Sequence, residues 1–242
     1  QKDCGLIMGP SNKELRNDST EVDQTTYRSS IRQEIEFGPG IITYTLEDEN
    51  SKIPINKTPL NTLVKVLTTV GVESKKEKDI IANSILDWID SDQNPRLNGA
   101  ENDFYQELTP PYFAKNAPIE HLDELAMIRG IDEKILYGTD QNKGLIDYFT
   151  TYNVKSINPN TASQKILSII FSKSQAKSII KEREEKGFYD NSKSDYFRIR
   201  STGKIKGSPT NHTINTVVQK IFDKANPIIL THYWNDNSFK NF

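Results

Sequence analysis

Hydrophobic positions recur along this chain with two different periods, and strand-like segments flank a long helical region. The turn signal Gly38-Pro39-Gly40 precedes a strand candidate at Ile41–Leu46. A second short candidate at Lys52–Ile55 contains Pro54, which confines it to a sheet edge or a strand end. After Ser194 the period of two returns in three further candidates, Tyr196–Arg200, Thr213–Val218 and Ile228–Trp234.

Between these strands, from about residue 58 to 186, apolar residues recur with helical spacing. Leu60, Leu63, Val64 and Leu67 fall on one face, and Gly71 is a candidate C-terminal cap. Further helices are predicted over 80–89, 122–131, 161–170 with Thr161 as N-cap, and 176–183.

Neither group of strands is large enough for a stable sheet alone, so we expect the two groups to pair across the helical segment. The predicted fold class is α+β, with an antiparallel sheet from which a helical domain emerges. The expected parts are a polar N-terminal arm, disordered or a frayed helix end, at 1–33; a discontinuous β domain at 34–57 and 190–242; and an inserted α-helical domain at 58–189.

Composition excludes only a few classes of protein. A net charge of −2 over 242 residues lacks the basic excess of a dedicated nucleic-acid binder. One cysteine, Cys4, excludes an internal disulfide framework. No stretch approaches the roughly 20 apolar residues that span a bilayer. Because the sequence begins without methionine, we expect any membrane anchor to lie upstream.

An acidic segment carries the strongest chemical signal. From Asp79 to Glu107, seven acidic residues face one basic residue, Arg96, and such a segment repels itself unless it is solvated or holds a cation. Counted from Asp90, oxygen-bearing side chains fall at the spacing of an EF-hand calcium loop. The candidate metal ligands are Asp90, Asp92, Asn94, Asn98, Glu101 and Asp103.

The match to an EF-hand fails at the sixth position. That turn requires glycine, whereas this chain has Pro95, so we expect Gly99 to make the sharp bend instead. Oxygen ligands without neighbouring His or Cys favour Ca²⁺ over zinc. The alternative is a solvated acidic loop, but the flanking residues Trp88, Phe104 and Tyr105 are expected to hold the segment against the core. Calcium is the predicted cofactor.

Two segments resemble the helix-hairpin-helix pairs of DNA-binding modules of the competence-receptor type, which makes such a module the alternative function. They begin at Leu122 and Asn160. Such modules bind phosphates through glycine-rich turns, yet Asp132 and Glu133 follow Gly130, and the second turn has no glycine. The stripe of Lys165, Lys173, Lys177 and Lys181 is interrupted by glutamates, so we interpret it as a solvated helix face and expect no nucleic acid.

No pattern typical of an enzyme stands out. His121, His212 and His232 lie in no metal or triad spacing, and Cys4 lacks a nucleophile motif. A phosphate-binding glycine loop and a serine elbow are both missing from the sequence. Asp90 and Asp92 could serve acid–base chemistry, but metal binding is the simpler account of so acidic a cluster. We therefore predict no catalytic residues.

Several ordered motifs over residues 36–234 together resemble the K-type minor pseudopilin family of bacterial type II secretion systems. They are Asp87–Asp92, Gly99-Ala100-Glu101 with Tyr105, Pro111-Tyr112, Asn116-Ala117-Pro118, Glu124-Leu125 to Gly130, Asn158–Ala162, and the flanks Asp48–Asn56 and Asp195–Phe197.

The resemblance implies a pilin-like sheet with a large helical insertion and a calcium site near the acidic loop. It further implies a place at the tip of the periplasmic pseudopilus, with I-type and J-type minor pseudopilins and the major pseudopilin filament as partners. An N-terminal helix, missing from this sequence, would anchor the protein in the inner membrane before assembly.

Overall fold

The computed structural model describes residues 30–221 and 228–238. Most of the predicted arm, residues 1–29, lies outside the described residues. The elements in chain order are β1 (Ser30–Phe37), β2 (Gly40–Asp48), η3 (Glu49–Ser51), β3 (Ile53–Pro54), η4 (Ile55–Lys57), α1 (Leu60–Thr69), α2 (Lys75–Ile89), α3 (Asn102–Gln106), η5 (Leu122–Met127), α4 (Glu133–Tyr137), η6 (Leu145–Asp147), β4 (Phe149–Thr150), α5 (Gln164–Ile170), α6 (Lys173–Lys186), β5 (Tyr196–Ile205), β6 (Asn211–Ile221) and β7 (Ile228–Ser238).

The described chain divides into two compact units. The sheet unit holds the residues up to Ser51, then Val154–Leu167 and the chain from Lys173 onward, whereas the helical unit holds Lys52–Asn153 and Ser168–Ser172. The bounds of the predicted insert, 58–189, differ from these, since α6 clusters with the sheet unit.

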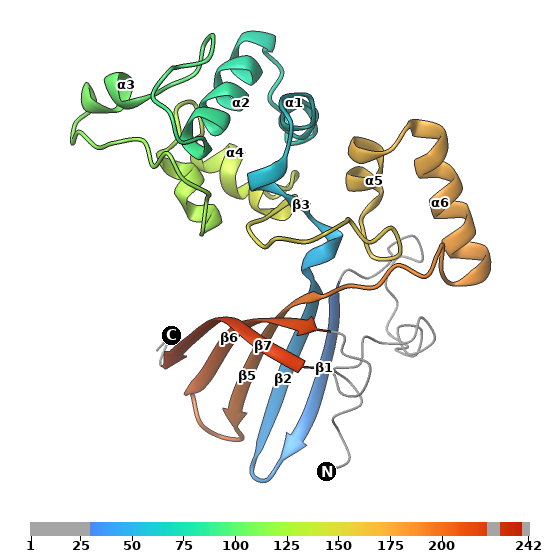
Figure 1. The fold of residues 1–242 in the computed structure, drawn as a ribbon. Coiled ribbons are helices and arrows are strands. Elements are labelled where there is room, and N and C mark those ends of the chain that lie inside the picture. Colours follow the sequence, from blue (N-terminus) through green and yellow to red (C-terminus); the bar gives the residue numbers. More distant parts are fainter. Residues whose placement is uncertain (1–29, 222–227, 239–242) are drawn as a thin grey trace. The chain divides into compact units, whose positions relative to one another are not determined.

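The sheet unit is built on five antiparallel strands in the order β1-β2-β5-β6-β7 (Figure 1). The strand before the helical segment pairs directly with the first strand after it, since Gly40 lies opposite Ile205 and Asp48 opposite Phe197. The expected pairing across the insertion and the α+β class are therefore confirmed.

Strand β1 was not predicted, because the polar sequence before Gly38 was assigned in part to the arm. Residues 30–33 of that arm begin β1, which forms a hairpin with β2. Gly38, in the turn, has a φ of +56°, a conformation that glycine adopts without a steric penalty. Pairing with β2 thus adds to the sheet one strand that the pattern of apolar residues did not predict.

Three distant segments of the sheet unit meet at Asp48, the last residue of β2. Its buried carboxylate accepts hydrogen bonds from the hydroxyls of Thr161 and Ser194 and, at 2.8 Å, from the backbone N–H of Asn50. Burial raises the pKa of Asp48, while these three donors oppose the rise. Thr161 was expected to cap a helix, but its hydroxyl donates to Asp48 instead. At the start of α5 it is the Ser163 hydroxyl that accepts a hydrogen bond from the Ile166 N–H.

Asn50 extends this contact between segments. Its side chain donates to the Asp195 carboxylate at 2.8 Å and accepts from the backbone N–H of Tyr196 at 3.0 Å, while its backbone carbonyl accepts from the Asn158 N–H at 2.8 Å. We call Asp48, Asn50, Asn158, Thr161 and Ser194 the polar junction. It fastens the end of β2 to the 158–161 loop and to the start of β5.

The helical unit packs apolar faces of short helices around a common core. Leu63, Val66 and Leu67 of α1 and Ile81 and Ile85 of α2 are each no more than 1% exposed. Gly71 follows α1 with a φ of +101°, as the predicted C-terminal cap requires.

Two predictions for the helical unit need correction. The short strand at Ile53–Pro54 does not join the large sheet; it pairs in parallel with β4 in a two-stranded sheet, and its proline ends it. The helix predicted over 122–131 is a 3₁₀ helix at Leu122–Met127, followed by a turn in which Gly130 has a φ of +85°. In the part of the chain that the structure describes, no helix is long and apolar enough to cross a membrane.

Candidate metal centre

Helix α2 positions the start of the acidic segment. Ser74 caps its N-terminus by accepting a hydrogen bond from the Glu77 N–H at 3.3 Å. Its apolar face is buried, so Trp88 in the last turn points into the core and is 2% exposed. Asp87 lies beside Trp88 in that turn, and Asp90 follows directly after the helix.

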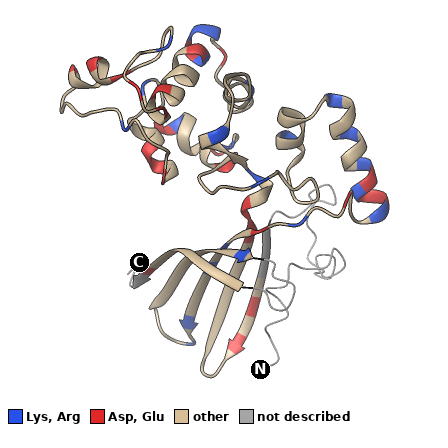
Figure 2. Cartoon of the chain, viewed as in Figure 1, with Lys and Arg blue, Asp and Glu red and all other residues tan. Residues whose placement is uncertain are grey.

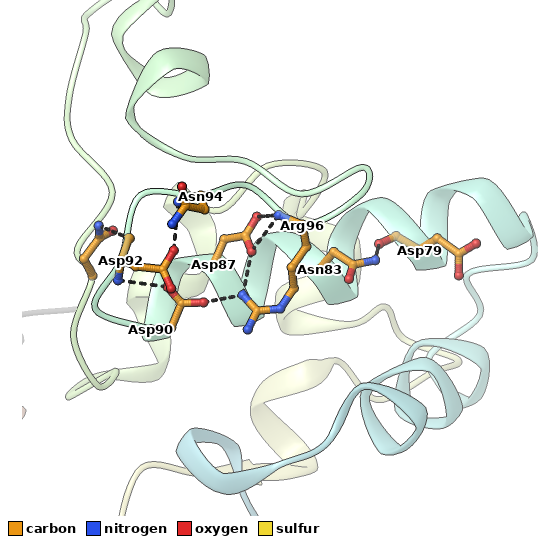
Figure 3. A network of polar contacts seen from close by, with 8 residues as sticks. Asp79, Asn83, Asp87, Asp90, Asp92, Asn94 and Arg96 are labelled. Atoms are coloured by element: carbon orange, nitrogen blue, oxygen red, sulfur yellow. Dashed lines mark hydrogen bonds and ion pairs between the residues drawn. The ribbon is translucent and has the colours of Figure 1, made fainter.

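Asp87 is fully buried and is held by Arg96. Its carboxylate accepts a hydrogen bond from the Arg96 guanidinium at 2.7 Å and from the Arg96 backbone N–H at 3.2 Å (Figure 3). The same guanidinium also forms an ion pair with Asp90. Asp87 was not among the predicted ligands, and its pairing with Arg96 gives it a role in fixing the shape of the loop.

The sharp bend of the loop lies one residue earlier than predicted. The Gly99 N–H donates to the Arg96 carbonyl at 2.8 Å, and Asn98, with a φ of +68°, occupies the left-handed position of that turn. Gly99 is needed for a different reason: a Cβ atom there would lie 1.8 Å from the Asp87 carboxylate. The structure thus corrects the expectation that Gly99 makes the bend.

Alternate side chains of the loop turn back toward the following backbone. The Asp90 carboxylate accepts from the Asp92 N–H at 3.3 Å, and the Asp92 carboxylate accepts from the Asn94 N–H at 2.8 Å. These short-range bonds give the loop its curvature without the glycine of an EF-hand.

Three of the four predicted carboxylate ligands come together. Asp90, Asp92 and Glu101 each offer an oxygen atom, and these atoms lie within 4.8 Å of one another. Asp103 is exposed in the first turn of α3 and is not part of this cluster. The remaining predicted ligands, Asn94 and Asn98, are both exposed residues of the loop.

Glu101 is the most informative member of the cluster. It is only 3% exposed, yet no donor among the described residues meets either carboxylate oxygen in good hydrogen-bond geometry. Burial, followed by the charges of the neighbouring aspartates, raises its pKa to about 7, and the nearby amide of Asn116 opposes that rise. A buried carboxylate without donors costs free energy, and a bound cation would remove that cost.

Aromatic residues hold the segment against the core, as expected from the sequence. The Trp88 and Tyr105 rings meet edge to face with centroids 5.3 Å apart, and Tyr105 stacks on Tyr112 at 5.2 Å. The Arg129 guanidinium lies over the Phe104 ring, with its Cζ atom 4.5 Å from the ring centroid. The acidic loop is therefore attached to packed structure on both sides.

This donor set fits a hard divalent cation. The clustered ligands are carboxylates with neither His nor Cys among them, which is the chemistry that Ca²⁺ prefers and zinc does not. The buried, donor-free oxygens of Glu101 distinguish the cluster from exposed acidic groups that are simply solvated.

The lysine stripe is accompanied by acids. Figure 2 shows both signs of charge along α6. Lys181 pairs with Glu185 at 3.8 Å and Lys186 with Glu182 at 3.0 Å, on an exposed helix face. These contacts support the interpretation of the stripe as a solvated face.

Comparisons with known proteins agree with these motifs. Residues 44–138 match the family model described as "Type II secretion system (T2SS), protein K". The type II secretion system protein K of Pectobacterium carotovorum subsp. carotovorum is 31% identical over 163 residues, which cover 63% of this chain and 47% of that protein. The protein K of Klebsiella pneumoniae is 27% identical over 136 residues, 56% of this chain and 40% of that protein.

Over residues 44–138 the chain is thus similar to the type II secretion system protein K family. It spans less than half the length of these two curated relatives. Its fold is also similar to a chain in the crystal structure of the GspK-GspI-GspJ complex from enterotoxigenic Escherichia coli, with a TM-score of 0.65 at 15% identity, covering 94% of this chain and 90% of that one. That likeness confirms the sheet-plus-helices fold. The DNA-binding alternative is not favoured.

Proposed function

We propose that this chain belongs to the protein K family and is part of a minor pseudopilin that acts in assembly at the tip of the periplasmic pseudopilus and thereby supports protein export across the outer membrane. The observation that carries the proposal is the family match over residues 44–138, which contain the acidic loop and most of the helical unit. The solved complex of similar fold holds GspK together with GspI and GspJ. We extend this association to the present chain, with I-type and J-type pseudopilins as its partners.

Further parts of the proposal follow from the family. The major pseudopilin filament is the structure on which the tip complex sits, and an anchor upstream of the present sequence would hold the protein in the inner membrane before assembly. We also propose that this role is structural rather than catalytic.

We also propose that the acidic loop binds Ca²⁺. The support is the cluster of Asp90, Asp92 and Glu101 and the buried oxygens of Glu101 that no donor among the described residues meets. A bound ion supplies positive charge that balances these carboxylates. Its role would be to fix the loop against α2 and α3, with no chemistry performed there.

Co-purification tests the assembly proposal. An affinity-tagged copy of the chain is expressed with the I-type and J-type pseudopilins of the same secretion system, and retained proteins are identified by mass spectrometry. We expect both pseudopilins to be retained with the tagged chain. Retention of neither, from a preparation in which all three proteins are soluble, would contradict a role at the tip.

A further inference from the structure

A group of apolar side chains on the helical unit is exposed to solvent and has no part in the functions proposed above. It follows α3 in the chain and includes Phe113, which is 67% exposed, Met127 at 43% and Leu108 at 36%. Pro110 and Pro111 belong to the same loop and are also exposed. We call Leu108, Pro110, Pro111, Phe113 and Met127 the apolar patch. Single exposed apolar side chains are common on protein surfaces, whereas a group of them marks an interaction site.

Hydrogen bonds bring the members of the apolar patch together. The Tyr105 carbonyl accepts from the backbone N–H groups of both Leu108, at 3.4 Å, and Tyr112, at 3.3 Å, so the loop between these two residues closes on the end of α3. The Tyr112 hydroxyl donates to the Met127 carbonyl at 2.6 Å, which places Met127 at the tip of that side chain. Phe113 follows Tyr112 directly. Two separate segments of the chain therefore form one patch.

The loop that carries the patch is held in place by packed structure. The Tyr112 ring stacks on the buried Tyr105 ring with centroids 5.2 Å apart, and the Tyr112 carbonyl accepts from the Gln106 side-chain amide at 2.8 Å. Just after the phenylalanine of the patch, the Ala114 N–H donates to the Asn102 side-chain carbonyl at 2.9 Å. Because this backbone is already ordered, binding a partner costs little of its conformational entropy.

Acidic side chains border the apolar patch. Asp103 and Glu107 lie four residues apart, in α3 and at its C-terminal cap, hence on one side of the helix, and Glu107 directly precedes Leu108. Both are exposed, and neither carboxylate has a hydrogen-bond or ion-pair partner among the described residues. The Arg129 guanidinium is already engaged with the Phe104 ring and with a backbone carbonyl. The border of the patch is therefore negatively charged.

This charge decides which kind of partner fits the apolar patch. A partner with a positive charge relieves the repulsion between the two carboxylates, whereas anionic lipid and nucleic-acid surfaces add negative charge. A second copy docked patch to patch about a two-fold axis brings Asp103 and Glu107 against their own counterparts. We propose that the apolar patch binds an extended segment of another protein, in which a large apolar side chain lies beside Lys or Arg.

The composition of the patch suits such a contact. Aromatic residues and methionine are enriched at protein interfaces, and proline presents a backbone whose φ is already fixed. The contact also gives a role to Asp103, which lies outside the carboxylate cluster of the acidic loop. This inference goes beyond the proposed assembly role and does not depend on bound calcium.

Random sequences supply the probe for this surface. A phage library of random short peptides is panned against the immobilised full chain, with the bare support as the blank. The most enriched peptide is synthesised with a fluorescent label, and its affinity for the chain is measured in solution by fluorescence anisotropy at low and high salt. We expect it to contain an aromatic or aliphatic residue next to Lys or Arg and to bind more weakly at high salt.

Two variants remove the features of the apolar patch one at a time. Phe113→Ser removes its most exposed side chain. Asp103→Asn combined with Glu107→Gln removes the two bordering charges and keeps the size of both side chains. We expect Phe113→Ser to weaken binding of the peptide by at least about tenfold, and the charge variant to weaken it severalfold and to reduce its salt dependence.

Matched controls make the same changes elsewhere. Phe188→Ser replaces an exposed phenylalanine of the sheet unit, and Glu73→Gln combined with Glu184→Gln removes two other exposed charges. Both controls are expected to bind the peptide with wild-type affinity. Exposed side chains such as these contribute little to stability, so the variants and their controls should all fold.

Several results would overturn the inference. One is a library that yields no enriched peptide, and another is a peptide that binds the patch variants and the control variants alike. A dimer of the wild-type chain in sedimentation velocity that Phe113→Ser abolishes would assign the patch to a second copy, and binding to phosphatidylglycerol vesicles abolished by the same change would assign it to a membrane. Should Phe113→Ser fail to fold, the charge variant decides by the same criteria. Co-purification with the I-type and J-type pseudopilins is measured separately, so these outcomes leave the assembly proposal intact.

Discussion

Single residues of the acidic loop have roles that differ from those assigned by their spacing. The buried Asp87 pairs with the more exposed Arg96 and so shapes the loop, while Gly99 leaves room for the Asp87 carboxylate. The alternating oxygens of the sequence predicted Asp90, Asp92 and Glu101 correctly as neighbours. The same spacing could not reveal Asp87, because its role depends on the burial of the helix turn on which it sits.

Gly99→Ala tests the close approach at this position. A Cβ atom would overlap the Asp87 carboxylate, so we expect the variant to lose about 1–3 kcal/mol of unfolding free energy, measured by chemical denaturation in chelated buffer. Gly203→Ala is the control, because a Cβ there meets nothing within 4 Å, and it should change little. Equal stability of both variants would show that the contact is not tight in solution.

The raised pKa of Glu101 predicts how pH affects the metal-free protein. Its pKa of about 7 lies above the usual 4.5, so the folded state holds a proton that the unfolded state releases. The stabilising contribution of this group is complete below about pH 4.5 and is lost as the pH rises through about 7. Melting temperatures measured from pH 5 to 8 in chelated buffer should show this loss.

Glu101→Gln supplies the comparison for the pH series. It keeps the size of the side chain and removes its titration, so the variant should lack the decline between pH 5 and 8 that the wild type shows. A variant with the same pH dependence as the wild type would mean that another group causes the decline.

At the scale of elements, apolar periodicity predicted α1, α2 and the strands around the insertion, because each of these buries a face. It did not predict β1, whose place depends on pairing with β2 rather than on a strong pattern. It also predicted a helix over 122–131, where the structure has a shorter 3₁₀ helix at Leu122–Met127. The prediction of Thr161 as a helix N-cap was wrong, because its hydroxyl donates to Asp48, which is 113 residues away in the sequence.

The polar junction is the element-scale feature with the clearest test. Thr161→Val keeps the shape of the side chain and leaves the buried Asp48 carboxylate without one donor, so we expect a loss of about 1–2 kcal/mol in unfolding free energy. The control is Thr69→Val, whose hydroxyl donates only to the Lys65 carbonyl one turn earlier in α1, at 2.8 Å. Similar losses in both variants would argue against a special contribution of the junction.

For the whole molecule, the two compact units have different relations to the family. The match over residues 44–138 falls mostly on the helical unit, which carries the proposed calcium site. The sheet unit carries the polar junction, through which its separate segments are joined. The proposed assembly role would require both units to keep their shape, the helical unit through the proposed ion and the sheet unit through buried hydrogen bonds.

The most direct test of this account is the melting temperature of the chain in chelated buffer with and without millimolar CaCl2. An ion that binds only the folded state at 100 times its dissociation constant adds about 2.7 kcal/mol. We therefore expect the melting temperature to rise by several degrees, to fall again with excess chelator, and to remain unchanged in an Asp92→Ala, Glu101→Ala double variant. An unchanged wild type, or an undiminished rise in the double variant, would contradict the assignment of calcium to the acidic loop.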